Sequence, residues 1–448
     1  EFRRVLFRSE VYVMPPAMMG YDRDVIFRLL KPVYGLVDAP LQWWVTVQDW
    51  MNRHGLRRSV FDPTVFTLNN PETGQLKGIV GVAVDDTIWG GDKDMQKIMH
   101  DFAVKFNIIE KGWDSAFGKN VKFLGHDVFQ CTKTHEVEVD QDHYIKENVK
   151  PVDLEPKRLK LPDDTLCTKP EIKLLQGSNG TNIWVIAQTR PDAAVQVSMT
   201  AGEIGSNPTL GTVRKLNKAV ACLRSRTMKI RYKRLGKTPS DFEILIFHDA
   251  AFGNLKGDAS QGGLMMFAIP RGSVTQEDFY NPNIKDVECV PLFWKSFKLQ
   301  RVARSTFCGE TLCASEALDI GQFQREFFWD LLNVHIPVTQ VTDCKSLKDN
   351  VDSIVPKCTE KRLRRDLHAL REAVQSNELD AFIWSDTRHQ IADALTKDMD
   401  ASAIIECFKN GRLRVGLSPE HVQRMKNAEK KAKRATRVGW WQNRSKLD

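Results

Sequence analysis

The clearest pattern of apolar and polar positions lies in the second half of the chain. Three apolar runs, EILIFHDAAF, GGLMMFAI and CVPLFWKS, have the length and composition of strands. A segment at about 305–332 has apolar residues at intervals of 3, 4 or 7, which predicts a long helix. Two more strand-like runs, VTQVTD and AFIWS, alternate with helical stretches at about 345–351 and 359–376 and a short helix near His389. The order βββαβα(α)βα predicts a mixed α/β layer domain over 241–400.

The first half of the chain is less regular but also mixes strands and helices. The run GIVGVAVDDTIWGG predicts a β-hairpin, and a helix is expected at about 93–106. FLGHDVFQ and HEVEVDQ predict a pair of strands, and Leu41 to Met51 has aromatic residues at helical spacing. Residues 150–182 are rich in Pro, Lys and Asp and predict a linker, followed by helices at 183–199 and 208–226. The predicted fold class is α/β and α+β, in several domains.

Charge is concentrated at the two ends of the chain. The formal net charge is +8, but the segment Arg424 to Arg437 alone holds seven basic residues and one acid. The opening nine residues add +2 and the last eleven add +1, so Glu10 to Gln423 sums to −1. The basic C-terminal tail is therefore a candidate for holding phosphate or for nuclear targeting, with a solvated disordered segment as the alternative.

Composition excludes several classes of protein. The nine Cys contain no CxxC pair and no nearby His cluster, which argues against a zinc site and against a disulfide framework. No apolar run approaches the roughly 18 residues of a membrane span, so we expect no membrane partner. The first nine residues, EFRRVLFRS, do not read as a signal peptide, and we expect them to be a non-native leader.

Asp85 and Asp86 stand side by side at the bend of the predicted hairpin. A turn is the ordinary interpretation of such a pair, because Asp is a common turn residue. Paired carboxylates at a hairpin tip are also what a magnesium-dependent phosphoryl-transfer site needs. Trp43, Trp44 and Trp50 have helical spacing, which favours a role in core packing over base stacking.

Four further carboxylates occupy distinctive places in the predicted C-terminal domain. Asp249 follows the apolar run of the first strand, where burial without a partner or a metal is costly. Glu310 opens the long helix on the face expected to pack against the sheet, and Asp343 ends the fourth strand. Asp393 lies in the final short helix. Each alone has an ordinary structural explanation, but acids at these four places can converge, and converging acids bind metal or take up protons.

The order of motifs resembles the reverse transcriptases of Ty1/copia retrotransposons. YGLVDAPLQWW, VAVDD and FLGHDV are similar to the family's YGLKQAP, YVDD and FLG motifs, and EVYVMPP resembles the segment after its first catalytic Asp. TRPDAAVQVSMT is similar to the family's TRPDIA block. The resemblance implies a partial palm at 10–110, a thumb-like region at 111–165 and a connection at 166–240. It also implies that Asp85 and Asp86 hold metal.

Three departures argue against polymerase activity in this chain. The family's first catalytic Asp would lie upstream of EVYVMPP, so the three-carboxylate site is one ligand short. Ala83 stands where the family has Tyr, and Val37-Asp38 replaces a Lys-Gln pair. We therefore expect polymerase ancestry with doubtful activity.

The second half resembles the ribonuclease H domain of the same elements. HDAAFGN is similar to SDADWAG, RSTFCGETLCASEA to SSTEAEYMA, TDCKSL to CDNQSA, and HQIADALTK to HxxIADxLTK. The resemblance implies that Asp249, Glu310, Asp343 and Asp393 are the metal-binding acids, and that His389 moves a proton, assists product release or has a structural role. The interval from Asp249 to Glu310 is long, which predicts a lengthened hairpin loop at 270–288.

The resemblance implies two-metal hydrolysis of the RNA strand of an RNA–DNA hybrid, with Mg²⁺ or Mn²⁺ as cofactor. RNA template, DNA primer and, for an intact polymerase, deoxynucleotides are the other expected partners. The expected location is a cytoplasmic virus-like particle, with the tail at 401–448 as a candidate nuclear address. The alternative, from another class, is a catalytically inactive relic or domesticated nucleic-acid-binding protein. The sequence gives no indication of oligomeric state.

Overall fold

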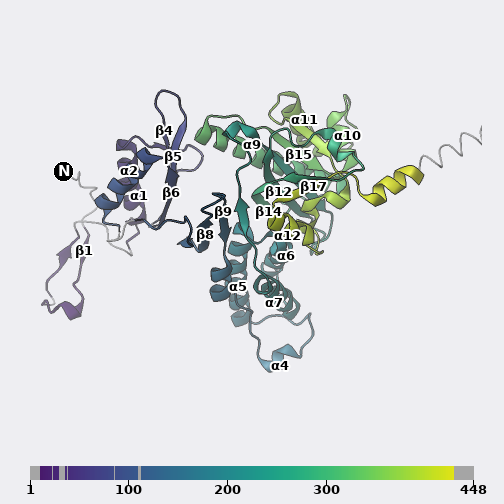
Figure 1. Ribbon diagram of the computed structural model, residues 1–448. Helices are drawn as coiled ribbons and strands as arrows, with labels where there is room; N and C mark the ends of the chain where they lie inside the picture. Colours follow the sequence, from purple (N-terminus) through teal and green to yellow (C-terminus); the bar gives the residue numbers. More distant parts are fainter. Residues whose placement is uncertain are drawn as a thin grey trace, which may run out of the picture. The chain divides into compact units, whose positions relative to one another are not determined.

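The computed structural model describes residues 11–22, 24–29, 36–37, 39–84, 86–108 and 113–427 (Figure 1). The chain separates into two compact units. The first comprises Glu1–Asp114 with Phe327–Asn333, and the second comprises Ser115–Glu326 with Val334–Asp448. The expected leader at 1–9, Asp85 and the tail from 428 onward lie outside the described residues.

The first unit is built on a four-stranded antiparallel sheet in the order β3-β4-β5-β6. The predicted hairpin is confirmed, because β5 and β6 pair from Gly78 with Gly91 to Ala83 with Asp86. The predicted helices near 41–51 and 93–106 are also present. The elements of this unit are β1 (Tyr12–Val13), η1 (Ala17–Met19), β2 (Phe27–Arg28), α1 (Ala39–Arg53), β3 (Arg57–Arg58), β4 (Val65–Asn69), β5 (Leu76–Ala83), β6 (Asp86–Gly91) and α2 (Lys93–Phe106).

The core of this unit lies between the sheet and its two longer helices. Trp50 is buried and stacks on the His54 ring, and its edge meets Phe102 of α2. Trp43 is partly buried against the same cluster. For these two residues the expectation of core packing is confirmed, since their indoles supply apolar area that a small unit needs.

The second unit opens with the sheet β10-β9-β8-β7, in which the predicted strand pair is confirmed as β8 and β9. Helices follow where a linker was expected, so that prediction is wrong for residues 169–182. Its elements up to this point are β7 (Val121–Phe123), β8 (His126–Gln130), β9 (Val137–Asp140), α3 (Asp142–Asn148), α4 (Pro156–Leu159), α5 (Lys169–Gln188), η2 (Pro191–Ala193), α6 (Ala194–Ile204), α7 (Leu210–Ser225), β10 (Ile230–Tyr232) and η3 (Pro239–Asp241).

Helix α5 forms despite two interior glycines, each of which costs about 1 kcal/mol relative to Ala. Its start is secured by a capping box, in which Thr168 and Glu171 exchange hydrogen bonds. Arg158 donates two further hydrogen bonds to the Glu171 carboxylate, at 2.8 and 2.9 Å. Buried Leu175 and Val185 add apolar contact, so capping and packing together outweigh the low helix propensity.

The helix expected at 183–199 is two elements, because the chain breaks at Arg190-Pro191. The Arg190 guanidinium is fully buried and forms a bidentate pair with Asp192 at 2.9 Å. It also donates to the carbonyl oxygens of Leu223 and Arg226 at the end of α7. The TRPD segment therefore ties α7 to the turn between α5 and α6.

The five-stranded mixed sheet that follows confirms the predicted order of elements and the α/β class. Its strand order is β14-β12-β11-β15-β16; β11, β12 and β14 pair antiparallel, and β15 runs parallel to both β11 and β16. The elements are β11 (Phe242–Ala251), β12 (Gln261–Pro270), α8 (Gln276–Phe279), β13 (Lys285–Glu288), β14 (Val290–Lys298), α9 (Thr306–Leu332), β15 (Val338–Thr342), α10 (Lys345–Asp352), α11 (Leu363–Gln375), β16 (Ala381–Trp384), η4 (Thr387–His389), η5 (Ile391–Leu395), α12 (Ser402–Asn410) and β17 (Arg412–Val415).

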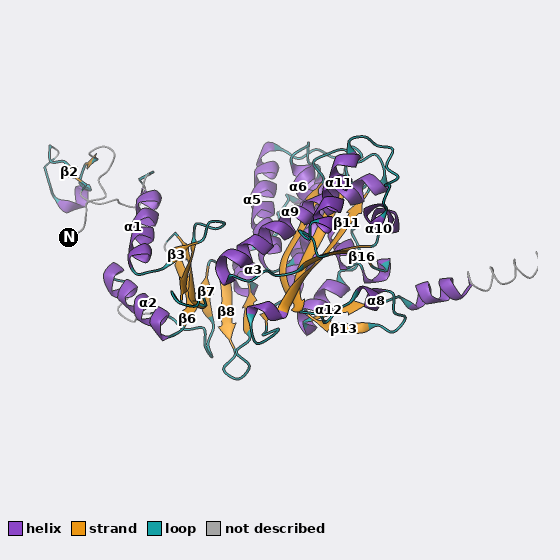
Figure 2. Cartoon of the chain, turned by 90° about the horizontal axis from the view of Figure 1, so that it is seen from above, coloured by secondary structure: helices purple, strands orange, loops and turns teal. Residues whose placement is uncertain are grey.

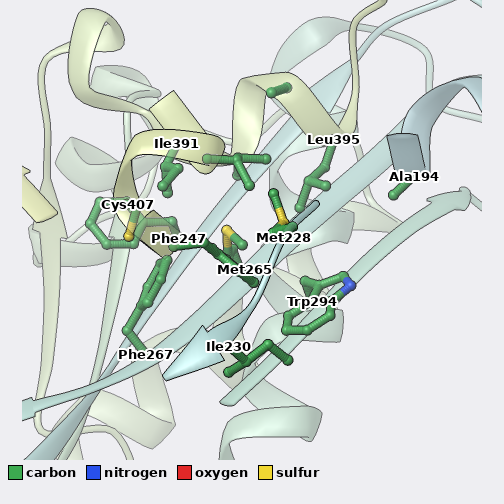
Figure 3. Close-up of a cluster of buried hydrophobic side chains, with 14 of the residues drawn as sticks. Ala194, Met228, Ile230, Phe247, Met265, Phe267, Trp294, Ile391, Leu395 and Cys407 are labelled. Carbon is green, nitrogen blue, oxygen red and sulfur yellow. The ribbon is translucent and has the colours of Figure 1, made fainter. Parts of the chain in front are cut away.

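Helices cover both faces of this sheet. Gly321 of α9 lies so close to Ile246 and Val338 that a Cβ there would stand 2.7 and 3.2 Å from their side chains, which places α9 on one face. Helix α10 lies beside β16 (Figure 2). On the other face, Phe247 and Phe267 pack with Ile391 and with Cys407 of α12 (Figure 3).

The lengthened hairpin loop expected at 270–288 does connect the antiparallel strands β12 and β14, but it contains α8 and β13, and β13 pairs antiparallel with β17. The expectation for the C-terminal segment is wrong. The segment expected as a tail from 401 is packed as far as Ser418, because apolar side chains of α12 and β17 join the sheet core. These side chains are Ile404, Cys407, Phe408, Leu413 and Val415. None of the described helices is long and apolar enough to cross a membrane.

Candidate metal centre

Asp249 stands at the C-terminal end of the central strand β11 and is 2% exposed. Its cross-strand partner is Gly263, and a Cβ on Gly263 would stand 2.7 Å from the side chains of Leu395 and Thr396. Gln390 donates to the His248 carbonyl oxygen at 3.0 Å and so anchors the start of η5 to β11. The absence of a side chain at 263 lets η5 approach the strand that carries Asp249.

Glu310 lies in the first turns of α9 and is 3% exposed, on the sheet-facing side as predicted. Its Oε1 accepts a long hydrogen bond of 3.4 Å from the Ala250 backbone N–H. Its Oε2 is buried and has no hydrogen-bond partner among the described residues. A buried carboxylate oxygen without a hydrogen-bond donor raises the free energy of the folded state. A bound cation or a proton on Glu310 would remove this cost.

Asp343 and Asp393 complete the convergence that the sequence predicts. Asp343 directly follows β15, and Asp393 lies in η5. One carboxylate oxygen from each of Asp249, Asp343 and Asp393 can be chosen so that all three lie within 4.8 Å of one another. That spacing is compatible with shared coordination of a cation by oxygen ligands.

Crowding of acids and burial raise several pKa values. Burial, then the neighbouring Asp249, raises the pKa of Asp393 to about 7. Burial and the charges of Asp249 and Asp343 raise the pKa of Glu310 well above its ordinary value. Burial and Asp249 likewise raise the pKa of Asp343. Without a cation, Asp393 therefore titrates near neutral pH, and a bound cation would favour the charged form of all three acids.

Two residues of the site, Thr396 and Lys397, belong to the HQIADALTK motif but received no role in the sequence analysis. The Thr396 hydroxyl donates to Oδ2 of Asp249 and is fully buried. The Lys397 ammonium lies 2.8 Å from Oδ1 of Asp393 and 3.3 Å from Oδ2 of Asp249. Burial opposes the charge of Lys397, but Asp249 and Asp393 outweigh it and raise the pKa of the ammonium. The spacing of Asp393 and Lys397, four residues apart, was the signal available in the sequence.

Asp249, Glu310 and Asp343 line an open cavity of about 500 Å³. Phe252, almost half exposed, stands on its rim beside the end of β11. The cavity lining comprises Asp249, Ala250, Ala251, Phe252, Thr306, Glu310, Asp343, Cys344 and Lys397. A cavity whose lining includes three acids and a lysine is suited to a ligand that brings cations or anionic oxygens.

His389 is not among the residues that line this cavity. It lies in η4, and the charged groups that act on it are Asp386, Arg414 and Glu420. Its Nε2 is buried without a partner among the described residues, and burial lowers the pKa of its ring. The turn that carries His389 still reaches the acids, because the Thr387 side chain forms a hydrogen bond with Asp343. The described geometry therefore groups His389 with the C-terminal segment.

Of the two candidate metal ligands in the polymerase half, the structure describes only Asp86. Asp86 is exposed as the first residue of β6, opposite Ala83. It belongs to no group of three candidate metal ligands within the described part of the chain. Asp85 lies outside the described residues.

Comparison with known proteins agrees with the motifs. Residues 2–160 match the family "Reverse transcriptase (RNA-dependent DNA polymerase)", a range that includes residues 2–9 of the segment expected to be a non-native leader. Over 439 residues, 92% of its length, the chain is 24% identical to the retrovirus-related Pol polyprotein from transposon RE1 of Arabidopsis thaliana. Over 86 residues, 19% of its length, it is 34% identical to the corresponding protein from transposon RE2 of the same plant. The chain spans 26% of the RE1 protein and 6% of the RE2 protein.

Solved structures give more distant likenesses. The foamy viral protease-reverse transcriptase in complex with RNA/DNA hybrid is 12% identical with a TM-score of 0.41, covering 80% of this chain and 39% of that one. LC11-RNase H1 in complex with RNA/DNA hybrid is 15% identical with a TM-score of 0.24, covering 36% of this chain and 99% of that one. By its family match and its similarity along almost the whole length, the chain is a relative of the Pol polyproteins of copia-type retrotransposons.

Proposed function

We propose that this chain is a metal-dependent nuclease that hydrolyses the RNA strand of RNA–DNA hybrids. The observation that supports it best is the set of three aspartate oxygens within 4.8 Å of one another, beside a buried Glu310 whose Oε2 lacks a donor. The chain's own match to the reverse transcriptase family supports a nucleic-acid substrate. The chain spans 26% of the RE1 Pol polyprotein, so the activities of that whole polyprotein are also only proposed for this chain.

The donor set fits Mg²⁺ or Mn²⁺, because these ions prefer carboxylate oxygens and keep room for water and substrate phosphate. Asp249, Glu310, Asp343 and Asp393 would hold the ions. When bound, such ions lower the pKa of a coordinated water and stabilise charge on the leaving oxygen. No zinc-type cluster of Cys and His is found among the described residues.

The chain's own residues supply the rest of the mechanism. Thr396 orients Asp249 through its hydroxyl, and Thr387 does the same for Asp343. Asp393, whose pKa is raised to about 7 in the metal-free site, would give up its proton when the site binds a cation. Contacts with the 2′-hydroxyls of the RNA strand would distinguish hybrid from DNA duplex.

Asp85 and Asp86 are proposed ligands of the polymerase metal, in the part of the chain that matches the reverse transcriptase family. RNA template, DNA primer and, for an intact polymerase, deoxynucleotides are the further proposed partners. A cytoplasmic virus-like particle, with nuclear entry through the basic tail, is the proposed location.

Cleavage of a labelled RNA–DNA hybrid in Mg²⁺ or Mn²⁺ tests the nuclease proposal. Wild type should cleave, Asp343→Asn should lose at least about a hundredfold in rate, and Asp349→Asn, an exposed acid of α10, should cleave like wild type. Equal background rates for wild type and Asp343→Asn would favour the inactive relic. Thermal unfolding of each variant separates loss of chemistry from loss of fold.

A further inference from the structure

We infer that Lys397 is a built-in counter-cation that competes with divalent metal for Asp249 and Asp393, and so sets the metal concentration at which the site fills. The inference rests on the proposed function, because it concerns the same acids. It goes further because it assigns control of the metal affinity to Lys397, a residue outside the four acids.

The Lys397 ammonium group contacts two of the three clustered aspartates. Lys397 Nζ lies 2.8 Å from Asp393 and 3.3 Å from Asp249, and these two acids share the metal-compatible cluster with Asp343. The contact with Asp393 is a local pair between residues four apart. The contact with Asp249 is a long-range one, between the end of η5 and the central strand.

Lys397 and a divalent ion cannot both take full advantage of these oxygens. An ammonium donates its hydrogens to the same lone pairs that a metal ion would use. A divalent ion brings twice the charge to a site of four acids, so it gains more Coulomb energy where burial lowers the effective dielectric. Metal binding therefore requires the Lys397 ammonium to leave these carboxylate oxygens or to share them with the ion.

Lys397 is able to move away while its carboxylate partner is not. Its side chain is 43% exposed, whereas the Asp249 side chain is 3% exposed. The backbone beside it is held in place, because Thr396 is buried and bonded to Asp249. Rotation about the flexible lysine stem alone carries the charge into the cavity, where it can meet a phosphate of a bound strand.

If Lys397 formed only a structural surface ion pair, its removal would have a different effect on metal affinity. An exposed pair between residues four apart contributes little and would leave metal affinity almost unchanged when removed. The inferred competition predicts that removing the ammonium raises metal affinity, because the acids lose an internal cation and gain uncompensated negative charge.

The test is Mn²⁺ binding to the full chain without nucleic acid, followed by calorimetry or by the loss of free-ion electron paramagnetic resonance signal. Lys397→Met should bind its first Mn²⁺ about tenfold more tightly than wild type. Lys397→Arg, which keeps the cation, should stay within about threefold of wild type. The matched control is Lys345→Met, which removes a lysine that follows Asp343 by two residues but pairs with Asp349; it should change affinity less than about twofold.

A second readout is thermal unfolding. Lys397→Met should melt below wild type without metal, because four acids then face one another unbalanced, and saturating Mn²⁺ should close that gap. Lys397→Gln serves the same purpose if Lys397→Met does not fold.

The outcomes separate the two proposals. Equal Mn²⁺ affinity in wild type and Lys397→Met, both abolished by Asp343→Asn, overturns the role of Lys397 and keeps the metal centre. Weaker binding by Lys397→Met overturns it as well. Failure of Mn²⁺ to bind any variant at millimolar concentration overturns the metal centre and the inference together.

Discussion

Ser418 donates both its backbone N–H and its hydroxyl to Oδ2 of Asp386, each at 2.8 Å, across 32 residues of sequence. Asp386 also accepts the Arg388 N–H and so caps the turn that carries Thr387 and His389. The C-terminal segment is in this way fastened to the turn whose Thr387 reaches Asp343. Residues that the charge pattern assigned to a tail therefore support the metal centre.

Ser418→Ala should lower the free energy of unfolding by about 1–2 kcal/mol, because one buried donor to a carboxylate is lost. Ser402→Ala, at the exposed start of α12, is the control and should change stability by less than about 0.5 kcal/mol. Urea unfolding followed by circular dichroism measures both. Equal stability of the two variants would show that the Ser418 contact contributes nothing.

In the metal-free protein, Asp393 should contribute stability that is lost as pH rises from about 4 to about 7. The pKa of Asp393 is raised from 3.8 to about 7 in the folded state. Within that window the folded protein keeps a proton that the unfolded chain has released, so the unfolded state binds fewer protons and the free energy of unfolding falls with pH. Melting temperatures between pH 4 and pH 8 measure the slope. Asp393→Asn should remove this contribution and make the slope more positive than in wild type, and an unchanged slope in that variant would contradict the contribution assigned to Asp393.

Gly263→Ala should displace η5 and disrupt the acid cluster. The added methyl would meet Leu395 and Thr396 at 2.7 Å and the Ala392 carbonyl oxygen at 3.1 Å, and overpacking of this kind costs about 1–3 kcal/mol. We expect lower stability and weaker Mn²⁺ binding.

The control is the same exchange at Gly177 of α5, where a Cβ meets nothing within 4 Å. Gly177→Ala should raise stability by about 0.5–1 kcal/mol through helix propensity. Wild-type Mn²⁺ affinity in Gly263→Ala would contradict the role assigned to this close approach.

Asp92→Ala should destabilise the first unit by about 1 kcal/mol. Asp92 accepts hydrogen bonds from the N–H groups of Asp94 and Met95 at the start of α2, at 2.9 and 3.1 Å. Lys97→Ala, on the exposed side of the same helix, should be nearly neutral. Hydrogen exchange at the amides of α2 reports the change locally, and equal protection in both variants would rule out a capping contribution.

Local sequence patterns were sufficient to predict many of the strands and helices. Alternating and helical apolar patterns predicted β5 and β6, helix α2, the strands of the five-stranded sheet and helix α9, because each element buries one face against a layer. The same patterns placed Asp249, Glu310, Asp343 and Asp393 at strand ends and helix starts that meet when the sheet forms.

Other features depend on contacts between distant residues, and no local pattern contains them. Helix α5 forms where composition predicted a linker, because Arg158 and a buried face offset its glycines. Segment 402–418 packs because its apolar side chains find the sheet core, although the basic residues beyond it suggested a tail. Lys397 and Thr396 became part of the site only because Gly263 lets η5 approach β11. The charged groups that act on His389 are Asp386, Arg414 and Glu420, two of which lie in the C-terminal segment. The sequence determined which acids the site contains, and the tertiary structure decided which cation and which hydroxyl groups accompany them, since those partners are set by the packing of η5 on β11.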